Sequence, residues 1–154
     1  MLRALPSPDW EKLVEAAPWA PRDSAGEIVH QGRMWILGGI ERYFVGDLLL
    51  NDVRSSTDGT SWACATEHAP WAPRAFHGAL AFAGKLWVFG GGNYVPTYGA
   101  YNDVWCSADG ANWTQVTAHA PWSPRGMIQG SLEFNGRMWL LGGGTYDTPA
   151  HPTR

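Results

Sequence analysis

The sequence predicts an all-β protein assembled from one repeated unit, and three observations support this. The phrase "APWAPR" begins at Ala17 and at Ala69, and "APWSPR" begins at Ala120, so the spacing is 52 and then 51 residues. Each copy is followed by a related apolar run, namely "GRMWILGG", "GKLWVFGG" or "GRMWLLGG". No window keeps apolar residues at helical spacing for three turns. A fixed period near fifty indicates a repeat architecture and suits a four-stranded propeller blade.

Each unit is expected to begin with a hairpin of two strands. First strands are predicted at Ser24–His30, Phe76–Phe82 and Ile128–Phe134. Second strands are predicted at Met34–Leu37, Leu86–Phe89 and Met138–Leu141. The second strands are apolar throughout, as in strands buried on both faces. The dipeptides "QG", "AG" and "NG" between the two strands indicate tight turns, and a glycine near the start of each first strand indicates crowding near a propeller axis.

Two further strands complete each unit. Third strands are predicted at Asp52–Ser56 and Asp103–Ser107, and fourth strands begin at Trp62 and Trp113. The turns between them, around Asp58–Gly59 and Asp109–Gly110, tolerate positive φ. An additional fourth strand is predicted from Trp10, because "WEKLVEAA" aligns with "WACATEHA" and "WTQVTAHA", which read as extended.

These motifs resemble those of a known repeat family. The Gly-Gly that closes each second strand, the hairpin after each first strand and the Trp of each fourth strand resemble kelch repeats. The form is similar to the bacterial kelch proteins related to the central domain of galactose oxidase, over nearly the whole chain. The pieces "STDGTSW" and "SADGANW" also resemble the Asp-box of sialidase-type propellers, but lack one residue between Asp and Gly. The resemblance implies kelch-type blades of four antiparallel strands.

The chain holds too few predicted strands for a ring. Propellers use four to eight blades, and this chain supplies two whole blades and parts of a third. The units span about residues 18–69, 70–120 and 121–154, the last one truncated, with residues 9–16 as a lone fourth strand. We expect either a piece of a longer chain, whose remaining blades close the ring, or two copies that close one ring. The piece of a longer chain is favoured. If two copies closed the ring, the shared blade would lack a third strand, and strand four would have no partner beside strand two.

Net charge, apolar run length and cysteine spacing limit the kinds of ligand and partner that are expected. The formal net charge is −3 and Lys and Arg are not clustered, so no nucleic-acid surface is expected. No apolar run approaches the length of a membrane span, and the start "MLRALPSPDW" has no signal-peptide core, which leaves the compartment open. No metal or other cofactor is expected, because CxxC motifs and His-rich clusters are missing. Cys64 and Cys106 fall in different blades, so both are expected to be buried free thiols.

The connections between strands indicate where a ligand would bind. Antiparallel strands send alternate connections to opposite ends of a blade, so the "APWAPR" links and the long two-to-three loops share one face, called here the link face. Loops on a rigid scaffold often carry binding. Arg22, Arg74 and Arg125 enter the first strands at this face. Either they bind carbonyls or carboxylates in neighbouring blades, which their identical placement favours, or they form a ring of guanidinium groups for an anionic ligand.

Other candidate ligand-binding residues lie on the same face. Tyr94, Tyr98 and Tyr101 lie in or beside a long loop, where aromatic rings suit contact with a sugar or a protein, or pack the loop onto the rim. His77 breaks the repeat symmetry near the axis. Its alternative role is that of a hydrogen-bonded core histidine. Glu27 is also unique to its copy, and is a candidate acid or base, or a partner of an arginine.

The sequence therefore favours a non-catalytic scaffold that binds a protein or a carbohydrate through the link face. The alternative is part of a sugar-active enzyme. Resemblance to galactose oxidase would imply copper ligands, but no motif matches them. Resemblance to the kelch sialate mutarotases would imply acid–base chemistry on a sugar carboxylate, with which the three arginine positions are compatible. The Asp-box resemblance supports the fold, since Asp-boxes are structural turns remote from catalysis.

Overall fold

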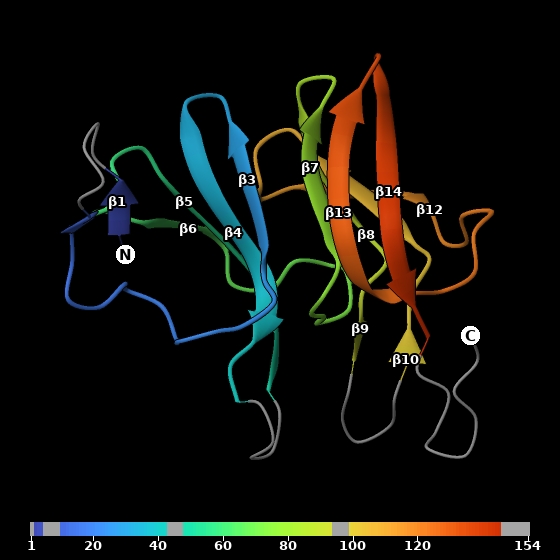
Figure 1. The fold of residues 1–154 in the computed structure, drawn as a ribbon, viewed down its shortest axis with the longest axis horizontal. Helices are drawn as coiled ribbons and strands as arrows, with labels where there is room; N and C mark the ends of the chain where they lie inside the picture. Colours follow the sequence, from blue (N-terminus) through green and yellow to red (C-terminus); the bar gives the residue numbers. More distant parts are fainter. Residues whose placement is uncertain (1, 5–9, 43–47, 94–98, 146–154) are drawn as a thin grey trace.

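A computed structural model describes residues 2–4, 10–42, 48–93 and 99–145. Every regular element in these residues is a β-strand, and they contain no helix that could span a membrane. Two four-stranded antiparallel sheets and one two-stranded sheet follow one another along the chain and stand side by side (Figure 1). The protein is thus all-β, with blade-like sheets in an arc that does not close.

The first two sheets are complete blades with the order that the repeats predict. Blade 1 has the order β3 (Gly26–His30), β4 (Arg33–Ile40), β5 (Leu49–Ser56) and β6 (Ala63–Thr66). Blade 2 has the order β7 (Gly78–Phe82), β8 (Lys85–Phe89), β11 (Val104–Ser107) and β12 (Trp113–Thr117). The third sheet contains β13 (Gly126–Phe134) and β14 (Arg137–Gly144), and is called here the C-terminal half-blade.

The strand predicted from Trp10 is not alone. β2 (Trp10–Lys12) pairs with β1 (Leu2–Ala4) in an antiparallel hairpin, called here the N-terminal half-blade. No strand was predicted at residues 2–4. A short ladder between β9 (Gly92–Asn93) and β10 (Gly99–Ala100) was not predicted either, and it extends blade 2 at the link face.

The turns have the backbone conformations that their sequences favour. The first residues of the three hairpin turns, Gln31, Ala83 and Asn135, all have positive φ and are each followed by glycine, as in type I′ turns. Between strands three and four, the carboxylate of Asp58 accepts backbone hydrogen bonds from Thr60 and Ser61, at 2.7 and 2.8 Å. Asp109 does the same in blade 2. These Asp-Gly pieces are therefore structural turns.

The hydrophobic core lies between the blades. Ile28, Trp35 and Leu37 of blade 1 pack against Leu86 and Val88 of blade 2. Leu80, Phe89 and Val104 of blade 2 pack in turn against the C-terminal half-blade, through Ile128 and Leu140. The inner strands β3, β7 and β13 lie next to one another, so their starts form the mouth of an axis at the link face (Figure 1).

The structure corrects the expectation for one cysteine. Both thiols are free, and Cys106 is buried as expected, but Cys64 is exposed. Cys64 lies on β6, the outer strand of blade 1, where the first half of the strand faces solvent. Partial desolvation of the sulfur and a hydrogen bond with Glu67 raise the pKa of the exposed Cys64 thiol above its usual value, which keeps it protonated at neutral pH.

Candidate functional site

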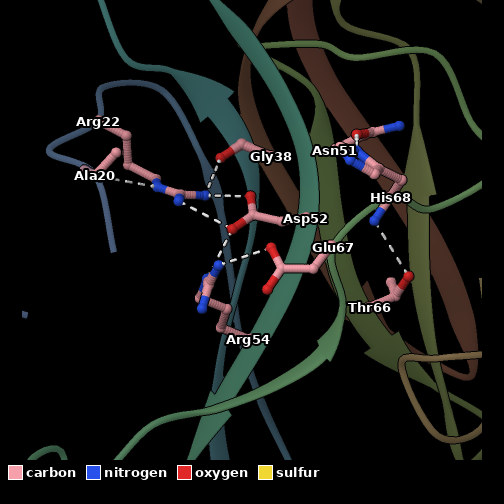
Figure 2. Close-up of polar contacts among 9 residues, drawn as sticks. All are labelled: Ala20, Arg22, Gly38, Asn51, Asp52, Arg54, Thr66, Glu67 and His68. Carbon is pink, nitrogen blue, oxygen red and sulfur yellow. Dashed lines mark hydrogen bonds and ion pairs between the residues drawn. The ribbon is translucent and has the colours of Figure 1, made fainter. Parts of the chain in front are cut away.

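The arginine of the first link is held inside its own blade. The guanidinium of Arg22 makes a bidentate pair with the Asp52 carboxylate, at 2.6 and 3.0 Å, and also donates to the backbone carbonyl of Gly38 (Figure 2). Arg54 donates to the same carboxylate at 2.8 Å. Burial would raise the pKa of Asp52, but the hydrogen bonds from the two arginines outweigh it and hold the pKa below its usual value.

The second link repeats this arrangement in a fully buried setting. Arg74 pairs with Asp103 at 2.6 and 2.8 Å, and donates to the carbonyls of Gly90 and Ala72. Its side chain has no exposed area, and its guanidinium lies 4.4 Å from the ring centroid of Tyr101. Hydrogen bonds to carbonyls and carboxylates of the protein therefore engage the guanidinium groups of Arg22 and Arg74. Each arginine pairs with a carboxylate of its own blade and not with one of a neighbouring blade.

The asparagine before each of these aspartates holds the next link. The side-chain amide of Asn51 donates to the backbone carbonyls of Ala69 and Trp71, at 2.8 and 3.2 Å. Asn102 donates to the corresponding carbonyls of the third link. The "ND" at the start of each third strand therefore fixes two successive "APW-PR" links. The joint recurrence of the "ND" dipeptide and the "APW-PR" link could be seen in the sequence. That the two motifs are in contact could not.

Arg125 differs from the other two link arginines. It donates to the carbonyls of Ser123 and Gly142, both at 3.2 Å, and to the Ser123 hydroxyl at 3.0 Å. Within the described residues it has no carboxylate partner, and it is only partly buried, whereas the side chains of Arg22 and Arg74 are 4% and 0% exposed. It is the link arginine whose charge is most available to a ligand.

A polar pocket lies where the three inner strands begin. Its volume is about 360 Å³. It is lined by residues of all three repeats, mainly Ser24–Glu27, Phe76, His77, Ala79 and residues 128–131. Ser24 and Phe76 have φ of 55° and 54°, a left-handed conformation that costs on the order of 1 kcal/mol or more for a residue other than glycine. This conformation lets Phe76 donate its backbone N–H to the Ser24 carbonyl, at 3.0 Å, and so links two blades at the mouth.

His77 is the most enclosed side chain of this axial pocket. It is 7% exposed, and both ring nitrogens are buried without a hydrogen-bond partner in the described residues. A Cβ added to Gly26 would lie 2.7 Å from its Nε2, and one added to Gly91 would lie 2.6 Å from its Cβ. Burial, with repulsion from Arg74, lowers the pKa of His77 to about 3. The imidazole is therefore neutral at neutral pH, and offers one donor and one acceptor.

Glu27 and Gln129 supply the other functional groups of the pocket. Glu27 is exposed as a whole, but partial desolvation of its carboxyl raises the pKa of that group above its usual value. Gln129 donates to the Met127 carbonyl at 3.3 Å and is exposed. The Ser131 hydroxyl donates to the Ala79 carbonyl of the neighbouring inner strand, at 2.8 Å. The pocket thus combines a carboxylate, an amide, an imidazole and a hydroxyl.

The remaining predicted residues are placed as follows. Tyr94 and Tyr98 lie outside the described residues. Tyr101 lies beside the Arg74 guanidinium. His77 and Glu27 both line the axial pocket. None of the three link arginines is among the residues that line it. No group of three or more metal-ligating side chains occurs among the residues that the structure describes.

We predict a pH effect from His77. Its pKa is about 3 in the folded chain and 6.5 for the free side chain, so between these values the unfolded state binds the extra proton. Stability therefore falls as the pH decreases through this window, by at most about 1.4 kcal/mol per pH unit. Urea unfolding of the parent chain and of His77→Gln, between pH 6.5 and 4.5, measures the difference. Glutamine is the replacement, because its side chain is polar and of similar size but does not titrate. Equal slopes for the two proteins would contradict the prediction.

The antiparallel four-stranded sheets, packed face to face around inner strands, define a protein of β-propeller blades. No family model matches the chain. The chain is 31% identical over 114 residues to the flagellar outer-arm dynein alpha chain of Chlamydomonas reinhardtii, and 32% identical over 113 residues to N-acetylneuraminate epimerase of Escherichia coli. These matches cover 70% and 71% of this chain, but 2% of the dynein and 30% of the epimerase.

Proposed function

We propose that this chain is a kelch-type propeller module that binds a carbohydrate at the axial pocket of the link face. One observation carries the proposal: the residues that line this pocket differ between the repeats, while the residues around them recur. Glu27 occupies the position of Ala79 and Ser131, and His77 that of Ala25 and Ile128, while Gln129 is the additional residue of a bulge in β13. A carboxylate, an amide and an imidazole at fixed positions suit a ligand with several hydroxyl groups. Distant similarity to an enzyme named for N-acetylneuraminate supports the same ligand class.

Titration with sugars tests this proposal. We expect N-acetylneuraminate, or a neutral hexose as the comparison, to give saturable binding by calorimetry or ligand-observed NMR. Gln129→Ala removes an exposed hydrogen-bonding amide from the pocket and is expected to weaken binding about tenfold. Gln115→Ala is the matched control, because Gln115 is an exposed glutamine on the outer strand β12. The proposal fails if neither sugar binds, or if both variants bind like the parent.

A second candidate function is acid–base chemistry on the bound sugar, as the resemblance to sialate mutarotases implies. The position of Glu27 favours this candidate, since its carboxyl lines the same pocket as His77 and has a pKa raised above its usual value, the direction that suits a general acid. Neutral His77 would then orient the sugar. Mutarotation of N-acetylneuraminate followed by ¹H NMR separates the two candidates. Binding without acceleration leaves the scaffold function; acceleration that Glu27→Gln abolishes while binding persists supports the enzyme.

A further inference from the structure

The N-terminal half-blade corresponds to the last two strands of a blade. Ala4 pairs with Trp10 as Ser107 pairs with Trp113 in blade 2, and Arg3 pairs with Glu11 as Cys106 pairs with Thr114. The register of β1 and β2 is therefore that of strands three and four.

The C-terminal half-blade corresponds to the first two strands. Leu132 pairs with Trp139 as Leu80 pairs with Trp87 in blade 2 and as Ile28 pairs with Trp35 in blade 1. The chain therefore contains strands three and four at one end of the arc and strands one and two at the other. The two half-blades lie far apart in Figure 1 and do not pair with each other.

The outer face of the C-terminal half-blade is apolar and uncovered. Leu132 and Leu141 are 41% and 45% exposed, whereas the equivalent Leu80 and Phe89 of blade 2 are 6% and 4% exposed. Blade 2 buries these positions against the sheet that follows it. The same face of the C-terminal half-blade has no following sheet among the described residues.

The opposite face of blade 1 is uncovered at the other end of the arc. Val29 is 75% exposed, and with Met34 and Ile36 it lines an apolar depression of about 340 Å³ that also contains Trp19 and Trp62. The equivalents of these residues in blade 2 pack against blade 1. They are Ala81, Leu86, Val88, Trp71 and Trp113. The two uncovered faces are thus the two faces that meet at each internal blade junction.

We propose that a second copy of this chain closes the ring, with the N-terminal half-blade of each copy completing the C-terminal half-blade of the other. Two whole blades and two half-blades per copy make a six-bladed ring with twofold symmetry, within the range that propellers use. β1 supplies the third strand whose absence argued against two copies. The internal register, in which Met34 pairs with Ser56 and Leu86 with Ser107, would pair Met138 with Ala4 of the second copy.

The positions of the tryptophan side chains also support a second copy of the chain as the partner. Each complete blade stacks its link Trp edge-on against its fourth-strand Trp: Trp19 lies 4.2 Å from Trp62, and Trp71 lies 5.8 Å from Trp113, between ring centroids. The third link Trp, Trp122, lines an apolar pocket of about 380 Å³ beside β14. Trp10, the fourth-strand Trp of the N-terminal half-blade, is 65% exposed. In the closed ring, Trp10 of one copy takes the place beside Trp122 of the other.

Light scattering after size-exclusion chromatography tests the ring, with disulfide trapping of its register. The 154-residue chain is expected to have twice the mass of 16.9 kDa. On a Cys64→Ser background, Ala4→Cys with Met138→Cys is expected to form two intermolecular disulfides per dimer under mild oxidation. Leu2→Cys with Met138→Cys is the control, because this pair is two residues out of register and too far apart to bridge.

A second set of variants separates the interface from the fold. Leu132→Asn changes an exposed side chain, and is expected to weaken dimerisation about tenfold per junction while the circular dichroism of the chain stays unchanged. Leu48→Asn, an exposed leucine at the loop end of blade 1, is the control and leaves the mass unchanged. A folded monomer at all concentrations, an open series of larger assemblies, or equal trapping of both cysteine pairs would overturn the proposal.

Discussion

Replacing Arg74 with methionine is expected to destabilise the folded chain by about 3–5 kcal/mol. The substitution keeps an unbranched apolar stem but removes the guanidinium that pairs with Asp103, and it leaves the Gly90 carbonyl without its donor. The side chain of Arg74 has no exposed area, so water cannot replace these contacts. Because a domain is stable by only about 5–15 kcal/mol, the variant is expected to be close to unfolding at room temperature. Urea denaturation measures the loss.

Two companion variants make this result specific. Arg125→Met removes the equivalent but only partly buried arginine, which has no carboxylate partner among the described residues, and is expected to cost less than about 1 kcal/mol. The double variant Arg74→Met/Asp103→Leu removes both charges, and is expected to recover part of the loss because no unpaired carboxylate remains. Equal losses for Arg74→Met and Arg125→Met would show that burial of the ion pair is not the cause.

Replacing Trp71 with alanine is expected to cost about 3–5 kcal/mol. Trp71 is 1% exposed and lies between Trp113, His77 and the core shared by blades 1 and 2. Its loss would leave a cavity at the blade junction. Trp71→Phe is the comparison: it keeps most of the apolar contact and removes an indole N–H that has no partner in the described residues. We expect Trp71→Phe to cost clearly less in thermal unfolding, and equal losses would argue against the cavity.

Local chemistry explains which parts of the fold were predictable. The hairpin turns at Gln31, Ala83 and Asn135 and the second strands follow from short sequence patterns, and the structure confirms both as turns and strands. Burial of the second strand on both faces holds for β8 but was wrong for β14, whose apolar residues are largely exposed. β1 was missed because three residues without the Asp-Gly turn of the other repeats give no local signal. β4 extends to Ile40, beyond the predicted end at Leu37, because a bulge at the Gly-Gly pair lets the ladder continue.

The site was predictable only in part, because its geometry is set between blades. The position of His77 on the first strand and its departure from the repeat could be read from the sequence. Its burial between Gly26 and Gly91 could not, because the two glycines belong to different blades. The pairing of Arg22 with Asp52 joins residues 30 positions apart. The recurrence of both residues in the repeats indicated a shared structural role. Their contact could not be predicted, because only the packed sheet brings the two side chains together.

The double use of the "ND" dipeptide has a consequence for folding. Asp52 anchors the link before blade 1 and Asn51 anchors the link after it, while the Gly39 N–H donates to the carbonyl of Arg74 in the next repeat. Among the described residues, hydrogen bonds therefore cross both the boundary between blades 1 and 2 and the boundary between blade 2 and the C-terminal half-blade. Because its repeats are coupled in this way, the chain should unfold as one cooperative unit, and its repeats should not unfold independently of one another. The structural repeat of this protein is thus not its folding unit, and a single excised blade is expected not to fold alone.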